Sequence, residues 1–399
     1  MFPFLNILAC AALAQEPSPL EGSFDGGFTF RTADAAQELK IGALLQTNLY
    51  AFPGGAPGRA NEAELRRMRL ELSGLVDGVW RFSLEPNFAA DGVELEEAWI
   101  GADLPGGALL MLGRMKEPFG MEELTPRKRQ DFPEYSLLNR WSPAEDHGIT
   151  LFGDAADGRL WYGIAAYNGT GGEEINSDKD VAARLAWHPQ GPPVADGARP
   201  FLEIAANATW GVAAQDLSGT SLYQDARQAF AVFEPGAELD GTRTRLGADL
   251  TWLTGPNALM AEIIRIGQEV AGGGGTGEAV TSGWLLSASR VLTGEARGWK
   301  GVWPRRPVGG GEGNAGAWQI AARWSELRLD GAWLDLGLLS TSSYPGTVRN
   351  LDVGLNWYAT RSAAWKLHLI QTFYEEDVVL GGEAVGGETT LLLQFQLAF

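Results

Sequence analysis

The last nine residues of the chain, 391–399 (LLLQFQLAF), constrain the fold more than any other segment. Every odd position from Leu391 to Phe399 is a leucine or a phenylalanine, whereas the even positions include Gln394 and Gln396. In a β-strand these two sets of side chains lie on opposite sides of the sheet. Because the apolar side runs to the final residue of the sequence, we expect it to be covered by something other than a later part of the same chain. A closed barrel with lipid outside and water inside provides such a surface.

Both ends of the sequence predict export. The last strand, with Phe399 at its end, resembles the signal by which the barrel assembly machinery recognises outer-membrane barrels. Residues 1–14 (MFPFLNILACAALA) are apolar and close with small residues at Ala12 and Ala14, as in a signal peptide, although no Lys or Arg precedes the apolar stretch. A lipoprotein signal ending before Cys10 is the alternative. Because Cys10 is the only cysteine, its removal would leave the mature chain without a disulfide.

The composition agrees with one long all-β domain. The 399 residues include 53 glycines and 15 tryptophans, and no apolar run reaches the roughly 18 residues of a helical membrane span. A net charge of −19 argues against nucleic-acid binding. We expect residues 15–37 to form an N-terminal segment that is either periplasmic or a plug in the lumen and that can include a short strand over 24–30. Residues 38–399 are expected to form the barrel.

Apolar and polar residues alternate across most of the chain, and the segment 80–89 shows the pattern clearly. Short polar or glycine-containing breaks separate the segments, as tight turns and longer loops do in such barrels. Two segments, 158–168 and 296–303, are weak, so 16 strands are as tenable as 18. The eighteen candidate strands are residues 39–50, 65–76, 80–89, 94–103, 108–116, 147–154, 158–168, 179–188, 200–212, 242–253, 258–269, 281–292, 296–303, 315–328, 331–340, 348–359, 363–375 and 387–399.

Nine tryptophans lie near the ends of these segments and predict two interfacial girdles, with rings among the lipid headgroups. The alternative is the ordinary core of a soluble β-sandwich. They are Trp80, Trp99, Trp161, Trp187, Trp210, Trp252, Trp284, Trp357 and Trp365.

One motif makes the interpretation more specific. Residues 113–120 (GRMKEPFG) resemble the G-x-x-K-x-P-F-G signature of the phosphate-selective porin O and P family. Three further segments, 66–70 (RRMRL), 146–148 (DHG) and 167–169 (YNG), resemble landmarks of the same family. The similarity covers most of the barrel region but is sharp only between about residues 60 and 190. Members are trimeric barrels, usually of 16 strands, that pass phosphate or other anions through a constriction of arginines and lysines.

The resemblance implies where that constriction lies. The longest polar connection in the first half of the chain, 117–146, joins the fifth predicted strand to the sixth. In trimeric porins the connection at this place folds into the lumen and narrows it. We therefore expect an all-β fold, a transmembrane antiparallel β-barrel of 16 strands (18 as the alternative) with an inward-folded constriction loop.

Guanidinium and ammonium groups in a narrow pore lower the barrier for anions, and arginine can bind phosphate oxygens in bidentate fashion. Candidates come from strand positions opposite the apolar face, from the constriction loop and from the signature motif. The candidate pore-lining residues are Arg67, Arg69, Arg81, Arg114, Lys116, Arg127, Lys128, Arg129, Arg140, Arg184, Arg243, Arg245 and Arg323, with Lys366 on a further strand.

Carboxylates near these cations leave a mixed-charge pore without anion selectivity as an open alternative. Glu122 and Glu123 lie in the same loop as the basic cluster of residues 127–129. Phosphate specificity is therefore implied by the resemblance to the family and is not required by the residues themselves. The other nearby carboxylates are Glu71, Glu85, Asp131 and Asp249.

Other functional classes fit less well. A hydrolase would need a nucleophile with a base, but the three histidines (147, 188 and 368) lie on separate segments and no G-x-S-x-G occurs. A secreted soluble all-β binding protein and a channel for sugars or organic acids remain alternatives. The sequence predicts an outer-membrane porin in contact with lipid, a homotrimer without cofactor or metal, that passes small solutes such as phosphate or other anions.

Overall fold

The computed structural model describes residues 19–53, 57–89, 92–171, 177–195 and 197–399. The predicted signal peptide, and with it the alternative lipoprotein site at Cys10, lies outside these residues. No helix in the described part of the chain has the length and apolar character needed to cross a membrane.

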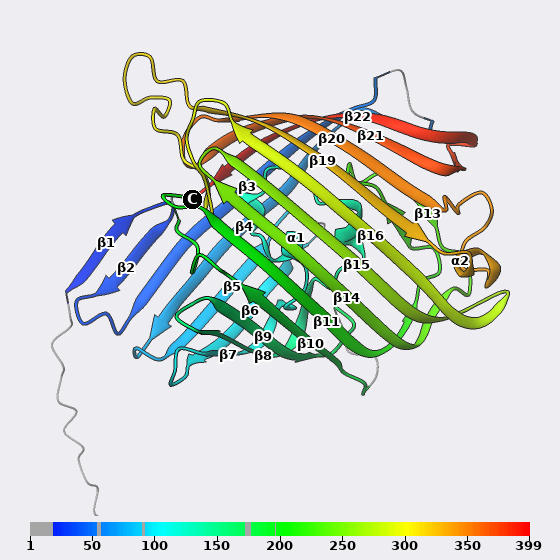
Figure 1. The fold of residues 1–399 in the computed structure, drawn as a ribbon, viewed down its shortest axis with the longest axis horizontal. Helices are drawn as coiled ribbons and strands as arrows, with labels where there is room; N and C mark the ends of the chain where they lie inside the picture. Colours follow the sequence, from blue (N-terminus) through cyan, green and yellow to red (C-terminus); the bar gives the residue numbers. More distant parts are fainter. Residues whose placement is uncertain (1–18, 54–56, 90–91, 172–176, 196) are drawn as a thin grey trace, which may run out of the picture.

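Sixteen antiparallel strands form one closed barrel (Figure 1). Each strand pairs with the next along the chain, and the last closes the barrel on the first, with Leu393 opposite Leu49. The strands are β3 (Glu38–Ala51), β4 (Glu62–Val76), β5 (Trp80–Asn87), β6 (Glu94–Asp103), β7 (Leu109–Lys116), β8 (Glu145–Ala155), β9 (Leu160–Tyr167), β10 (Asp180–Trp187), β11 (Phe201–Asp216), β14 (Glu238–Thr254), β15 (Asn257–Gly272), β16 (Gly275–Val291), β19 (Ala317–Leu329), β20 (Thr347–Tyr358), β21 (Ala363–Leu380) and β22 (Glu383–Ala398).

The count of 16 is confirmed, and the alternative of 18 is wrong because two predicted strands are loops. Residues 296–303 contain only the two-residue strands β17 (Arg297–Gly298) and β18 (Gly301–Val302), since Gly301 at φ 99° turns the chain back. Residues 331–340 contain the short helix α2 (Ala332–Asp335), whose Trp333 is buried among loop residues. The weak segment 158–168 is a true strand, β9.

The alternation in the last strand is confirmed by burial. Gln394 and Gln396 are 0% and 5% exposed inside the barrel, whereas Leu397 on the other face is 36% exposed. Most of the predicted girdle tryptophans also face outward. Trp161 does not, because it lines the lumen, and Trp99 packs partly buried against an interior cluster.

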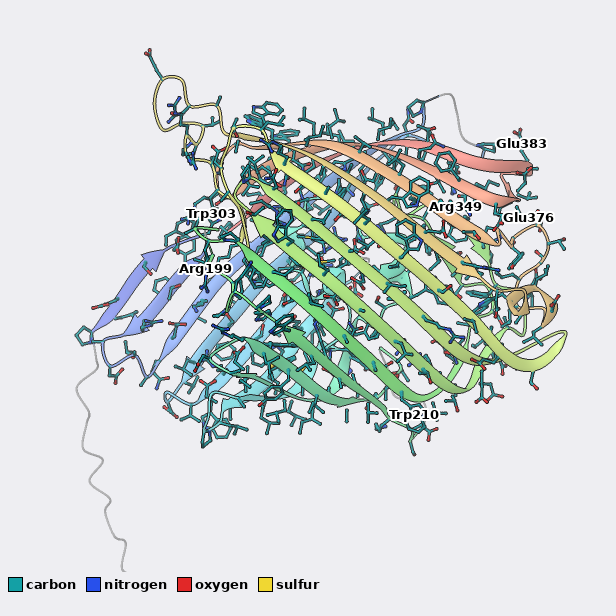
Figure 2. All side chains as sticks on the ribbon, in the orientation of Figure 1. Arg199, Trp210, Trp303, Arg349, Glu376 and Glu383 are labelled. Atoms are coloured by element: carbon teal, nitrogen blue, oxygen red, sulfur yellow. The ribbon has the colours of Figure 1, made fainter. Side chains whose placement is uncertain are left out.

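The two ends of the barrel differ in their connections. At one end, here called the turn end, most strands are joined by a few residues, although the connection 292–316 is long and contains the β17–β18 hairpin. The opposite, loop end carries the long connections 117–144, 217–237 and 330–346. Figure 2 places Glu383, Glu376 and Arg349 toward the loop end, and Arg199 and Trp303 toward the turn end.

The N-terminal segment forms a hairpin at the turn end rather than the single strand predicted over 24–30. Strand β1 (Leu20–Phe24) pairs with β2 (Phe28–Thr32), and β2 pairs with the first residues of β3. The rings of Phe24 and Phe28 lie 6.5 and 6.1 Å from that of Phe399. The hairpin extends the wall beyond the end of β22 and projects from the barrel (Figure 1), so residues 19–37 do not plug the lumen.

Deleting residues 19–33 is therefore expected to leave single-channel conductance unchanged, because the hairpin lies beside the passage. Planar-bilayer recordings of the refolded full chain and the deletion variant check this. A larger conductance in the variant would contradict the position of the hairpin.

Candidate pore constriction

The connection from β7 to β8, residues 117–144, folds into the lumen as predicted and is called the constriction loop below. It contains three short helical turns: α1 (Met121–Leu124) and the 3-10 helices η1 (Arg127–Arg129) and η2 (Leu137–Arg140). The chain enters α1 through Gly120 at φ 71°, a left-handed conformation that glycine adopts without strain. A Cβ on Gly120 would lie 2.8 Å from Oε1 of Glu262 on β15, so the backbone also approaches the wall closely here.

Glu134 fastens the constriction loop to β3 and β4. Its carboxylate accepts hydrogen bonds from Nε of Arg66 at 2.9 Å, Nη2 of Arg67 at 3.2 Å, Nη2 of Arg127 at 3.1 Å and Nδ2 of Asn48 at 2.9 Å. A register shift between β3 and β4 leaves Arg66 unpaired, which lets this residue join Arg67 on the inner side. Although burial alone would raise the pKa of Glu134, Arg67, Arg66 and Arg127 hold it well below its usual range.

Arg323 on β19 is a second anchor. Its guanidinium donates to Glu122 and to Asp225, both at 2.8 Å, and to the carbonyl of Glu134 at 3.2 Å. It also lies 4.4 Å from the ring centre of Phe132. Asp225 belongs to the loop 217–237, so one side chain ties two loops to the wall. Burial raises the pKa of Asp225 to about 7 despite the neighbouring Arg323.

Further contacts hold the middle of the constriction loop. Asp131 accepts from Nε of Arg297 at 2.8 Å, and its carbonyl accepts from Asn356 at 2.8 Å. The carbonyl of Gln130 accepts from Nζ of Lys366, also at 2.8 Å. Arg297 comes from the β17–β18 hairpin at the turn end, so the loop is held from both ends of the barrel.

Apolar side chains fill the lumen on the side of β15 to β22. Leu138 of the constriction loop, Phe230 of loop 217–237 and Trp333 of α2 belong to one buried cluster. Trp141 and Trp333 meet with ring centres 5.3 Å apart. The same cluster includes the short strand β13 (Ala229–Val232), which pairs with β12 (Ser221–Tyr223). The passage is thereby confined to the opposite side of the constriction loop.

Two cavities lie between the constriction loop and the wall from β3 to β15. The wide cavity, about 540 Å³, extends along β8 to β11 and reaches β14, β15 and the β17–β18 hairpin. The narrow cavity, about 260 Å³, extends along β3 to β6 and the facing ends of β7 and β8. Leu124, Pro126 and Arg129 line both cavities, so these three residues form the rim between them.

Most of the predicted cationic side chains form ion pairs with neighbouring carboxylates. Arg69 bonds Glu85 and Glu96, Lys116 bonds Glu123, and Lys128 bonds Glu71. The remaining pairs on the lumen side are Arg67 and Arg127 with Glu134, Arg184 with Glu203 and Asp249, Arg243 and Arg245 with Asp180, and Arg323 with Glu122 and Asp225.

Arg129 differs from these cations. Its guanidinium makes no hydrogen bond or ion pair with any residue that the structure describes, and it lies on the rim of both cavities. Burial lowers its pKa, with Arg297 acting in the same direction and Glu71 against it, but an arginine remains charged.

Three candidates lie away from the rim. Arg81 pairs with Asp103 at the turn end with its side chain 44% exposed. Arg114 shares its strand face with the outward Leu112 and donates to the carbonyls of Leu95 and Gly171. Arg140 lies over the ring of Tyr223 at 5.1 Å from its centre.

Sequence reasoning did not identify Arg66, Arg297 or Glu134 as parts of the constriction. Arg66 faces inward only because of the register shift. Arg297 lies in segment 296–303, which the sequence predicts as a strand but which is part of a loop in the structure. Glu134 carried no signal of its own, because its importance comes from three arginines that meet it in space.

A closed 16-strand barrel, narrowed by an inward-folded loop between its fifth and sixth strands, is the architecture of a porin, a water-filled channel of the bacterial outer membrane. The chain matches the model of the family described as phosphate-selective porin O and P over residues 46–399, and it belongs to that family. The protein is thus an outer-membrane channel.

Solved structures share this fold at low sequence identity. The outer membrane channel DcaP of Acinetobacter baumannii matches with a TM-score of 0.57 and 10% identity, over 93% of this chain and 99% of that one. An anion-selective porin from Comamonas acidovorans matches with a TM-score of 0.55 and 13% identity, over 91% and 100%. OmpT of Vibrio cholerae in its trimer form matches with a TM-score of 0.53 and 7% identity, over 91% and 100%. No curated protein sequence matches the chain.

Proposed function

We propose that this channel passes small hydrophilic solutes by passive diffusion with a modest preference for anions, phosphate among them. The observation that carries the proposal is the guanidinium of Arg129, which has no partner among the described residues and lies on the rim shared by both cavities. Every solute that crosses beside the constriction loop passes this charge at close range. A fixed cation in a narrow, partly desolvated passage lowers the barrier for anions and raises it for cations.

The linings of both cavities support a modest rather than a strict preference. Ionisable lining residues of the narrow cavity are five cationic and four anionic side chains, and those of the wide cavity, His188 aside, are three and two. The chain's overall charge of −19 weighs less, because a permeating ion senses charges within a Debye length of about 8–10 Å. A general pore without selectivity is the second candidate, favoured by the ion pairs that most of the other predicted cations form.

Replacing Arg129 with glutamine is expected to move the reversal potential in a KCl gradient from the anion side toward zero or the cation side, because the unpaired cation is gone. The measurement uses the refolded protein in planar bilayers, followed by phosphate titration into the chloride current. Phosphate is expected to reduce the current of the native channel more than that of Arg129→Gln.

Arg349→Gln is the matched control, since Arg349 pairs with Glu326 on the outer surface at 2.8 Å. It should keep the native reversal potential. If Arg129→Gln also keeps it, the anion preference does not come from Arg129 and the general pore becomes the better description.

The assembly proposed here is a homotrimer, delivered to the membrane by the barrel assembly machinery through the strand ending at Phe399, with residues 1–14 removed as a signal peptide. The family assignment and the trimer form of one structural neighbour support the trimer. Light scattering on the detergent-solubilised protein is expected to give three copies per particle, and a monomer would contradict it.

A further inference from the structure

The wide cavity has a lining that ion passage alone does not require. Three aromatic side chains border it: Phe152 and Trp161 from β8 and β9, and Trp299 from the β17–β18 hairpin. The rings of Phe152 and Trp161 lie 5.1 Å apart between centres. Further apolar or weakly polar residues complete this side, namely Met121, Leu124, Pro126, Pro192, Pro193, Leu253 and Met260. The narrow cavity, by contrast, is lined mainly by charged groups.

Most charged side chains of the wide cavity already make hydrogen bonds within the protein, so few of their donors and acceptors are left for a solute. Arg184 donates to Asp249 and Glu203, and Glu203 also bonds His188 at 2.8 Å. Each nitrogen of the Arg297 guanidinium likewise donates a hydrogen bond, to Asp131 and to the carbonyls of Gly298 and Arg129.

Apart from the indole N–H groups of its tryptophans, three polar groups of the wide cavity remain available among the described residues. Arg129 has a free guanidinium, and the hydroxyl of Thr251 is buried without a hydrogen-bond partner. Asp154 is a free carboxylate at the end of β8. With one free cation and one free anion on the lining, the cavity favours a solute with one negative charge over a solute with two, because Asp154 repels the second charge.

We propose that the wide cavity binds aromatic monocarboxylates as they cross the channel. The ring of the solute lies against Trp161, Phe152 and Trp299, and its carboxylate meets Arg129 on the rim. A volume of about 540 Å³ is within the range of roughly 300–1,000 Å³ of small-molecule sites. This inference rests on the proposed channel function and names the class of solute for its wide cavity.

The test compares benzoate with acetate as blockers of chloride current through the refolded protein in planar bilayers. The two share the carboxylate and differ in the ring. Benzoate is expected to block at lower concentration, by about twofold to tenfold for each ring contact, since an aromatic pair contributes about 0.5–1.5 kcal/mol. Phosphate, with more charge and no ring, should block less well than benzoate.

Trp161→Ala is expected to bring the benzoate block close to that of acetate. Trp365→Ala removes an outward tryptophan that is 41% exposed and serves as the matched control, which should keep the native ratio. Arg129→Gln should weaken the block by both carboxylates, so a second variant tests the site if Trp161→Ala fails to insert.

Equal block by benzoate and acetate in the native channel would overturn the inference, as would equal loss in Trp161→Ala and Trp365→Ala. The reversal potential of the same channels in a KCl gradient tests the anion preference independently of the block experiment. An anion-sign potential without benzoate selectivity rejects the aromatic site and leaves the proposed function intact. A cation-sign potential rejects the anion preference, and equal block by the two carboxylates would then reject the site as well.

Discussion

Replacing Arg323 with alanine is expected to release the constriction loop and to increase the conductance of the channel. The substitution would leave Glu122, Asp225 and Asp352 facing one another without the cation that all three contact. Removing one partner from a buried ion-pair network costs about 3–5 kcal/mol, because the remaining charges stay buried. The cost falls on the docked state of two loops, since Asp225 belongs to loop 217–237 and Glu122 to the constriction loop.

Two measurements check this expectation. Single-channel recordings should show larger and noisier current steps, and thermal unfolding in detergent should shift to lower temperature. Arg349→Gln again provides the control, because a partly exposed surface pair is worth about 0–1 kcal/mol. If Arg323→Ala behaved like Arg349→Gln in both measurements, Arg323 would not anchor the loop.

The barrel could be predicted from sequence because its pattern is local. Each strand shows its two faces through alternation, and lipid on one side with water on the other makes that contrast strong. The same rule fails where apolar residues serve a loop. Residues 331–340 carry leucines on both faces, which signals burial but not extension, and the structure uses Trp333 within the loop-end cluster. Residues 296–303 alternate only weakly, and Gly301 allows a reversal that the pattern does not reveal.

The candidate site was harder to predict, because a guanidinium's role depends on its partner. Strand parity correctly places Arg67, Arg184 and Arg323 inside the barrel. It gives no information on which carboxylate each one meets, since Glu134 lies 67 positions from Arg67 and Asp225 lies 98 positions from Arg323. The sequence also gives no sign that Arg129 has no partner among the described residues, because this is visible only in three dimensions.

Replacing Glu134 with glutamine is expected to undock the constriction loop from β3 and β4. Arg66, Arg67 and Arg127 would then lie close together without their shared anion, at a cost of about 3–5 kcal/mol for a buried network. Conductance should rise and thermal stability should fall, as for Arg323→Ala. Glu326→Gln is the control, because Glu326 pairs with Arg349 on the outer surface and should change neither quantity appreciably.

The pH dependence distinguishes Glu134 from the other carboxylates of the lumen. Its pKa is held well below the value of about 4.3 expected in the unfolded chain, so the unfolded state binds the proton more readily than the folded one. The stability that Glu134 contributes is therefore present above about pH 4 and is lost as the pH falls through the lower folded-state pKa. The thermal unfolding midpoints of the native protein and of Glu134→Gln should thus converge between pH 7 and strongly acidic pH. The native protein is expected to lose more stability than the variant over this range. Parallel curves would show that the three arginines do not hold the Glu134 carboxylate in its charged form.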